Sequence, residues 1–242
     1  MRGVAGISWI WVAVALFGAY MLAQVISPGE TTKRLATVQD SDLGPRRIDY
    51  IGAHLARKDL VRQNLAQVDF TNANLSGADL SRAIVTDADF TDANLSRAVL
   101  IRTSATGASF QSADLDKAQL TRAELDNVDF TNANLSGAIL IGANLEASLL
   151  LGAKLEGADL DEAHLRGARL TNANLRRARL TRTDLRGADL TNANLERASL
   201  VGANLSGANL DGATLTGVQL EDITYDQTTI WPTGFDPATI AR

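Results

Sequence analysis

Residues 70–95 read FTNANLSGADLSRAIVTDADFTDANL, and this stretch decides the fold because an apolar residue stands at every fifth position. The same register runs from Leu55 to Ile230, which gives 36 centres, of which 32 are Leu or Phe. Two residues before the centre, 26 of the 36 positions are Ala, and no insertion interrupts the register over these 176 residues. The other centres are Val85, Ala105, Tyr225 and Ile230. Such regularity predicts a repeated structural unit of five residues.

A period of five excludes an α-helix, in which successive centres would step about 140° around the axis and form no apolar stripe. In a strand, the Ala and the centre two residues later face the same side. The next Ala, however, follows the centre at an odd offset of three residues. The chain must therefore turn a corner after each centre, and we expect small polar residues or Gly at the corners.

The number of sides follows from residues that recur at longer intervals. Phe occupies four centres and Arg recurs at a fixed position, in both cases every twenty residues: Phe70, Phe90, Phe110 and Phe130, and Arg62, Arg82, Arg102 and Arg122. A triangular coil would give an interval of fifteen, so four units make one coil. Thirty-six units then make nine coils, stacked about 4.8 Å apart by parallel pairing. The predicted fold class is all-β, a quadrilateral parallel β-helix whose crossovers favour the right hand.

The unit Ala-(Asp/Asn)-Leu-x-x, as in 73–77 and 78–82, resembles the pentapeptide-repeat family over nearly three quarters of the chain. The resemblance implies the right-handed quadrilateral β-helix. The closing stretch from Tyr225 to Pro237 is similar to the C-terminal segments of cyanobacterial members of the family. This resemblance implies a cyanobacterial origin, with the thylakoid as one candidate membrane. The sequence thus predicts a β-helix over residues 51–220 and a C-terminal cap over residues 221–242.

Residues 1–28 are predicted to form a transmembrane helix, because no charged residue occurs from Gly3 to Ile26. A helix of this length reaches about 36 Å, more than the hydrocarbon core of about 30 Å. Its large side chains include Trp9, Trp11, Phe17 and Tyr20. A cleaved signal peptide is the alternative, but the apolar run is longer than usual and lacks a clean cleavage site. Residues 29–50 are a polar linker, and the side of the membrane on which the repeats lie stays open.

Composition argues against chemistry carried by the chain. It has no Cys, which removes thiolate nucleophiles and thiolate metal sites, and a net charge of −5 that is too mild for polyanion binding. Its two histidines, His54 and His164, are 5.5 coils apart, or about 26 Å. No Gly-rich phosphate loop or nucleophile elbow occurs. We expect a protein that is not an enzyme and has no metal or cofactor.

Two sets of outward residues are candidate contact surfaces. One is a basic stripe of like charges: Arg62, Arg82, Arg102 and Arg122. It is either a solvated ladder with carboxylates such as Asp79 or Glu124 nearby, or a stripe that binds an anion or a protein. The other set is apolar: Val99, Ile101, Ile139, Ile141, Leu149 and Leu151. Seven arginines between Arg166 and Arg186 form a second basic zone that contains Asp184.

These features predict a membrane-anchored scaffold, with the lipid bilayer and a protein partner or a larger membrane complex as its partners. The partner docks on the solenoid, on the membrane helix, or on both. No nucleic acid partner is expected. Two alternatives stay open at this point: a DNA mimic that binds gyrase, as some members of the family do, and a secreted lumenal or periplasmic structural protein, if the leader is cleaved.

Overall fold

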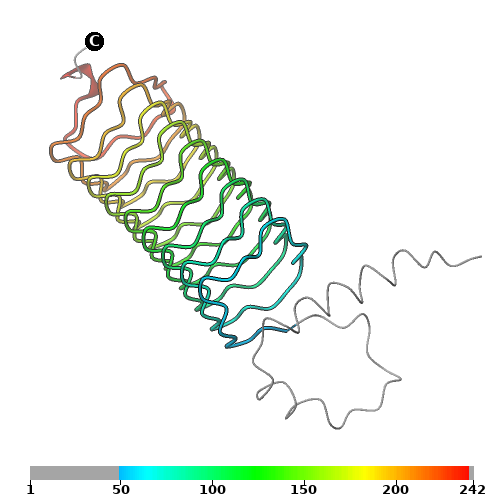
Figure 1. Ribbon diagram of the computed structural model, residues 1–242. Coiled ribbons are helices and arrows are strands. Elements are labelled where there is room, and N and C mark those ends of the chain that lie inside the picture. The colour runs from blue at the N-terminus through cyan, green and yellow to red at the C-terminus, as the bar shows by residue number, and fades with distance from the viewer. Residues whose placement is uncertain (1–48, 240–242) are drawn as a thin grey trace, which may run out of the picture. The chain divides into compact units, whose positions relative to one another are not determined.

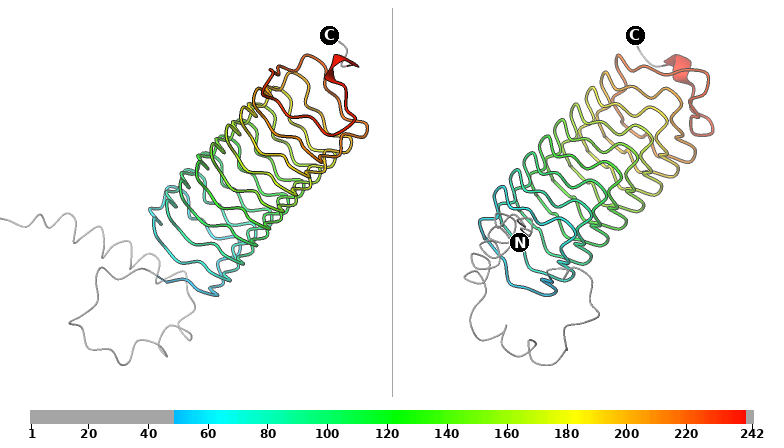
Figure 2. Two further views of the ribbon diagram at one scale, coloured as in Figure 1. Left: turned by 180° about the vertical axis from the view of Figure 1, so that it is seen from behind. Right: turned by 90° about the vertical axis from the view of Figure 1, so that its right-hand side faces the viewer.

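The computed structural model describes residues 49–239, which lie within the compact unit Arg47–Arg242. In this unit the chain winds in successive coils along one axis, from the blue N-terminal end to the red C-terminal end (Figure 1). Views from behind and from the side show the same stack (Figure 2). The unit is therefore a solenoid.

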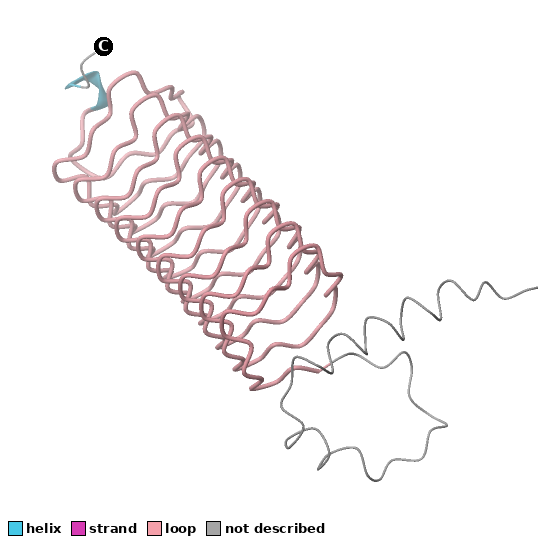
Figure 3. Cartoon of the chain, in the orientation of Figure 1, coloured by secondary structure: helices cyan, strands magenta, loops and turns pink. Residues whose placement is uncertain are grey.

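Each coil has four sides and pairs in parallel with the next one, as predicted. The pairs join residues twenty apart, beginning with Asp49 and Asp69, and four such pairs follow one another around each coil. The prediction of strands, however, is wrong for residues 49–239. Each side has a single paired residue between two turns, and the only helix in the part of the chain that the structure describes is the short η2 (Pro237–Thr239), so the walls are drawn as loops in Figure 3. A unit of five residues leaves only three for the side once two have formed the turn.

The corners are β-turns whose third residue has a positive φ. This holds at every fifth position from 52 to 222, at 13 glycines and 22 other residues. A positive φ at the third residue alone defines a type II turn, which favours Gly or Asn there. The prediction of small polar residues or Gly at the corners is too narrow, since nine of these positions are Arg, such as Arg102 with φ 56°. The long side chain is accommodated because the corner points away from the core.

Every backbone N–H of a typical unit has an acceptor, as the unit 73–77 shows. The Ala73 N–H closes the turn on the Phe70 carbonyl at 2.8 Å. The second residue donates to the coil before, and the third and fifth residues donate to the coil after, at 2.7–2.9 Å. The fourth N–H, of Ser76, donates to the side-chain oxygen of Asn74 at 3.1 Å. Buried backbone donors need such partners, so the Asp/Asn position completes the set.

The axis of the solenoid is filled by the centres and by the Ala residues. Leu, Phe and Ala at these positions are almost wholly buried from Leu65 to Leu210. The four phenylalanines stack in one column with ring centroids 4.6–5.1 Å apart, and Tyr50 extends the column at 5.5 Å from Phe70. Where a hydroxyl replaces the Ala, as in Thr103 and Ser148, it donates to a backbone carbonyl at 2.7 Å. The core is therefore regular and has its polar groups satisfied.

The five-residue register breaks at Asp226, contrary to the prediction. Ile230 pairs with Asn209, twenty-one residues away, and is 52% exposed, so it is not a core centre. The extra residue is Asp226, whose carboxylate accepts the N–H of Thr228 at 2.8 Å. Beyond the break, the ring of Trp231 lies 5.5 Å from that of Tyr225 and 5.0 Å from that of Phe235. The role of residues 221–242 as a cap stays a prediction.

Between Asp49 and Thr239 the structure contains no helix with the length and apolarity needed to cross a membrane. The predicted anchor, residues 1–28 with Trp9, Trp11, Phe17 and Tyr20, lies outside the described residues, as does the linker up to residue 48.

Candidate interaction surface

The Asp/Asn positions of the repeat stabilise turns. A ladder of asparagines accepts, in each case, the backbone N–H two residues further on, at 3.0–3.2 Å: Asn74, Asn94, Asn134, Asn174 and Asn194. His54 and His164 occupy the same position of their units, and each is paired with a neighbouring coil. Among residues 49–239, no group of three His, Cys, Asp or Glu side chains could hold a metal ion. Most of the polar ladder is thus part of the scaffold.

Four of the predicted apolar residues come together on one side of the solenoid. We name Val99, Ile101, Ile139 and Ile141 the apolar strip. Val99 and Ile139 belong to one column of paired residues, two coils apart, with Gln119 between them. The centres that they flank are fully buried, whereas Ile139 is 38% exposed and the other three are partly exposed. The strip therefore adds little to the core.

Leu149 and Leu151 do not join the apolar strip. Leu149 pairs with Asp129 and Arg169, in a column on a different side of the coil. Both leucines are partly exposed, and their neighbours in the column are polar or charged. The six apolar residues of the sequence analysis thus form two separate groups.

The basic stripe lies at the corners next to the apolar strip. Arg62, Arg82, Arg102 and Arg122 all have φ values near 57° and exposed side chains. In residues 49–239 none of the four makes an ion pair or a side-chain hydrogen bond. Neither Asp79 nor Glu124 forms an ion pair with these arginines, and the choice between a solvated ladder and a binding stripe stays open. Among the described residues, the stripe is therefore a row of arginines without paired carboxylates.

One shallow groove joins the basic stripe and the apolar strip. It has a volume of about 430 Å³ and is lined by two adjacent columns: Ser81, Ile101, Thr121 and Ile141, and Arg82, Arg102 and Arg122. Since the lining residues of both columns come from successive coils, the groove runs along the axis. At its far end, the Cγ of Arg122 lies 3.6 Å from the place a Cβ would occupy on Gly142, so the arginine stem leans along the same axis. Parts of the two surfaces predicted as separate candidates thus line one groove, named the Arg/Ile groove below, whereas Val99, Ile139 and Arg62 lie outside its lining.

Four of the seven arginines of the second basic zone form ion pairs, most of them with carboxylates of neighbouring coils. Arg176 lies 3.0 Å from Glu156 and 3.4 Å from Glu196, and Arg182 lies 2.6 Å from Glu162. Arg186 is paired with Asp184. Counting charges along the sequence missed these pairs because most of the carboxylates are eighteen or twenty residues away from the arginines. In contrast, none of the four arginines of the basic stripe forms an ion pair within residues 49–239.

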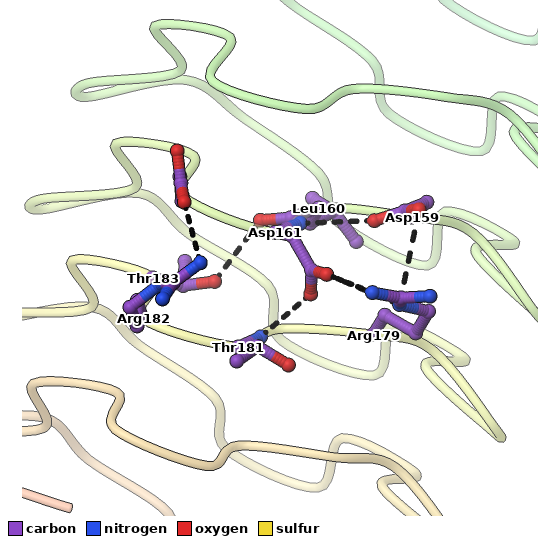
Figure 4. Close-up of polar contacts among 8 residues, drawn as sticks. Asp159, Leu160, Asp161, Arg179, Thr181, Arg182 and Thr183 are labelled. Carbon is purple, nitrogen blue, oxygen red and sulfur yellow. Dashed lines mark hydrogen bonds and ion pairs between the residues drawn. The ribbon is translucent and has the colours of Figure 1, made fainter.

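Arg179 and Asp161 form the centre of a network in the second basic zone (Figure 4). The Asp161 carboxylate accepts hydrogen bonds from the Arg179 side chain and from the backbone N–H of Thr181, the latter at 2.9 Å. Burial raises the pKa of Asp161, but the hydrogen bonds from Arg179 and Thr181 outweigh it, so the pKa lies below its ordinary value. In the neighbouring column, the hydrogen bond from Arg186 lowers the pKa of Asp184. Both carboxylates are therefore charged in the folded protein.

Comparisons with known proteins bear on the repeats. Among protein families, pentapeptide repeats match in eight copies, over residues 51–82, 83–122, 113–150, 148–187 and 188–223. No match was found among curated proteins. One similar solved structure is HetL, a pentapeptide repeat protein involved in heterocyst differentiation regulation from the cyanobacterium Nostoc sp. strain PCC 7120. It has 37% identity and a TM-score of 0.44, with 73% of this chain and 82% of HetL covered.

Two further solved structures are similar to parts of the chain. Rfr23 from the cyanobacterium Cyanothece 51142 has 39% identity and a TM-score of 0.38, over 38% of this chain and 63% of its own. A pentapeptide repeat protein from the Arabidopsis thaliana thylakoid lumen has 29% identity and a TM-score of 0.35, over 48% of this chain and 71% of its own. The repeats match well over half of the chain and imply a right-handed β-helix solenoid. This protein therefore belongs to the pentapeptide repeat family.

Proposed function

We propose that this protein is a non-enzymatic interaction module that docks a protein partner on the outer surface of its solenoid. The observation that carries the proposal is the Arg/Ile groove, where guanidinium groups that pair with no carboxylate of residues 49–239 lie beside partly exposed isoleucines. Neither set of side chains is needed to fill the core, which is complete with the centres and the Ala residues. Apolar side chains gathered on a polar surface are typical of contact sites.

The proposal includes attachment to a membrane through residues 1–28, so that the partner is a membrane protein or a membrane-bound complex. Its support is the sequence, in which residues 3–26 are uncharged and long enough to span. The segment would then tether the solenoid to the membrane that holds the partner. Such tethering raises the local concentration of the module near a partner in the same membrane.

Purification of the tagged full-length protein from solubilised membranes, followed by mass spectrometry, tests the proposal. The four residues of the apolar strip would be changed together to Ser, and Ile84→Ser would be the control. Ile84 is 43% exposed and lies on a neighbouring side, so this control removes one exposed isoleucine outside the apolar strip. We expect a specific protein to be retained by the wild type and by Ile84→Ser, and lost from the fourfold variant.

A partner that is retained equally by all three proteins would contradict docking on this side of the solenoid. If that partner is lost only when residues 1–28 are replaced by an unrelated membrane helix, the membrane segment is the docking element.

A further inference from the structure

We infer that the Arg/Ile groove takes an amphipathic helix of the partner, which carries an acidic stripe beside an apolar stripe and lies along the solenoid axis. This inference rests on the proposed function and names the kind of partner segment that docks. Three observations carry it: the charge of the groove, the spacing of its side chains and its limited length.

The charge of the groove favours an anionic occupant. Arg82, Arg102 and Arg122 follow one another on successive coils, and the part of the chain described here supplies none of them with a carboxylate. Like charges about 4.8 Å apart repel one another. In contrast, Arg182, in the same column of corners, is paired with Glu162 of the coil before. Carboxylates from a partner would form the same kind of ion pair with the arginines at these three corners.

The spacing of the side chains fits a helix. Adjacent coils are about as far apart as the Phe90 and Phe110 rings, whose centroids are separated by 4.6 Å. Carboxylates three or four residues apart on a helix are separated by about 4.5–6 Å along the axis. Ile101 and Ile141 are two coils apart, roughly 9.6 Å, and helix residues seven apart are separated by about 10.5 Å. One helix can therefore reach the arginines and the isoleucines together.

An extended peptide fits the groove less well. Its side chains on one face recur about every 6.8 Å, out of step with the coils. It would also present both faces alternately, so only half of its side chains could reach a groove that lies along one edge of the solenoid.

The length of the groove argues against a nucleic acid. The row of arginines ends at Arg122, because the next two corners are Gly142 and Glu162. Asp159 follows in the column of Val99 and Ile139. A phosphate backbone that continued along the axis would meet these carboxylates. The basic row from Arg62 to Arg122 covers three coil spacings, roughly 14 Å, which corresponds to about ten residues of helix.

The test uses the full-length protein in detergent micelles and a fluorescent helical peptide of about 16 residues. The peptide has Glu on one stripe and Leu on the adjacent stripe. A second peptide of the same composition has its order shuffled so that both stripes are lost. We expect saturable binding of the first peptide, with at least about tenfold weaker binding of the shuffled one, and a clear loss of affinity at high salt.

Variants locate the binding site. Arg82→Gln, Arg102→Gln and Arg122→Gln together remove the charge and keep most of the stem, and Ile101→Ser with Ile141→Ser removes the apolar part. We expect either set of substitutions to lower the affinity for the peptide by about tenfold or more. The control is Arg57→Gln, Arg97→Gln and Arg177→Gln, which removes the same charge from another edge with the same corner geometry. It should leave binding within about twofold, since distant surface charges are screened.

Equal binding of the two peptides, or equal losses in the groove and control variants, would overturn the inference. So would a duplex DNA that binds more tightly than the peptide with the same dependence on the three arginines. If the peptide does not bind while the cellular partner is still lost from the apolar-strip variant, docking holds and the helical occupant is wrong. If neither the peptide nor a cellular partner depends on the groove, the proposed function fails as well.

Discussion

The carboxylate of Asp161 accepts the backbone N–H of Thr181, twenty residues further along the chain, at 2.9 Å. In most units this N–H is taken by an Asp or Asn two residues before it, within the same side of the coil. At residue 179 that position holds Arg, which has no acceptor. Asp161 of the preceding coil supplies the acceptor instead and also binds the Arg179 side chain. Asp161 thus replaces the acceptor that is lost because Arg179 stands at an Asp/Asn position of the next coil.

This relationship makes the stability of the protein depend on pH through Asp161. The pKa of Asp161 is lowered in the folded state, so its contribution is present above the unfolded value of about 3.9 and is lost as the pH falls through the folded value. Asp161→Asn keeps an oxygen for the Thr181 N–H but loses the charge. We expect the wild type to be more stable than this variant at pH 6, with a smaller difference at pH 3. Urea unfolding at both pH values measures it, and an equal difference at both would contradict the assignment.

The left-handed corners predict opposite effects for two substitutions. Gly167 has φ 65° and no atom within 4 Å of an added Cβ, so Gly167→Ala tests the backbone alone. It should lower the free energy of unfolding by about 1 kcal/mol. Ala147 is an exposed corner residue with φ 56°, and Ala147→Gly should raise the stability by up to about 1 kcal/mol. Denaturant unfolding would show the two shifts, and shifts of the same sign would contradict the turn geometry.

Gly212 is a corner where, unlike at Gly167, an added Cβ would collide with a side chain. A Cβ on Gly212 would lie 2.2 Å from the Oδ1 of Asn192, so the Asn192 side chain would have to move. Gly212→Ala should therefore destabilise the protein more than Gly167→Ala does.

The phenylalanine column predicts how the core responds to lost volume. Phe110 is fully buried between Phe90 and Phe130, and the same column continues with Leu150 and Leu170. Phe110→Ala should lower the free energy of unfolding by about 3–5 kcal/mol, because it leaves a cavity. Phe110→Leu should cost distinctly less, since Leu suits this position in later coils. Equal losses, measured by urea unfolding, would mean that the column does not depend on packed side-chain volume.

The sequence predicts the number of sides and the inward positions because the core demands the same residue types at each coil. The twenty-residue spacing of Phe70, Phe90 and Phe110 carried that inference, and the pairing of residues twenty apart confirms it. Arginine at the corners was harder to expect, since type II turns favour Gly there and only outward space permits Arg102. The shift at Asp226 is one residue long and lies where the repeat fades, so Ile230 still matched the apolar pattern.

The Arg/Ile groove was predicted in its parts and not as a site. Ile101 and Arg102 are neighbours in the sequence, but the sequence does not show that their side chains line one groove with those of the adjacent coils. It also does not show which arginines are paired. Arg179 forms an ion pair with Asp161 of the preceding coil, whereas Arg102 forms none with any carboxylate of the described residues.

Membrane attachment is a separate prediction from the sequence of residues 1–28. The full-length protein should stay with the membrane fraction after a carbonate wash, because a spanning helix is not removed by charge neutralisation. A form that begins at residue 29 should be released by the same wash. Sequencing of the N-terminus of the native protein gives the contrary outcome: a mature chain that begins near residues 24–28 would mean that the segment is a cleaved leader.

Hydroxyl-radical footprinting of the assembly purified from membranes tests the central claim most directly, because it needs no substitution. Ile139 and Ile84 are isoleucines of similar exposure, 38% and 43%, on different sides of the solenoid. In the assembly, compared with the isolated full-length protein, we predict that oxidation of Ile139 and of Ile101 falls while oxidation of Ile84 is unchanged. Equal oxidation of Ile101 in both samples, or protection confined to Leu149 and Leu151, would show that the partner does not dock at the Arg/Ile groove.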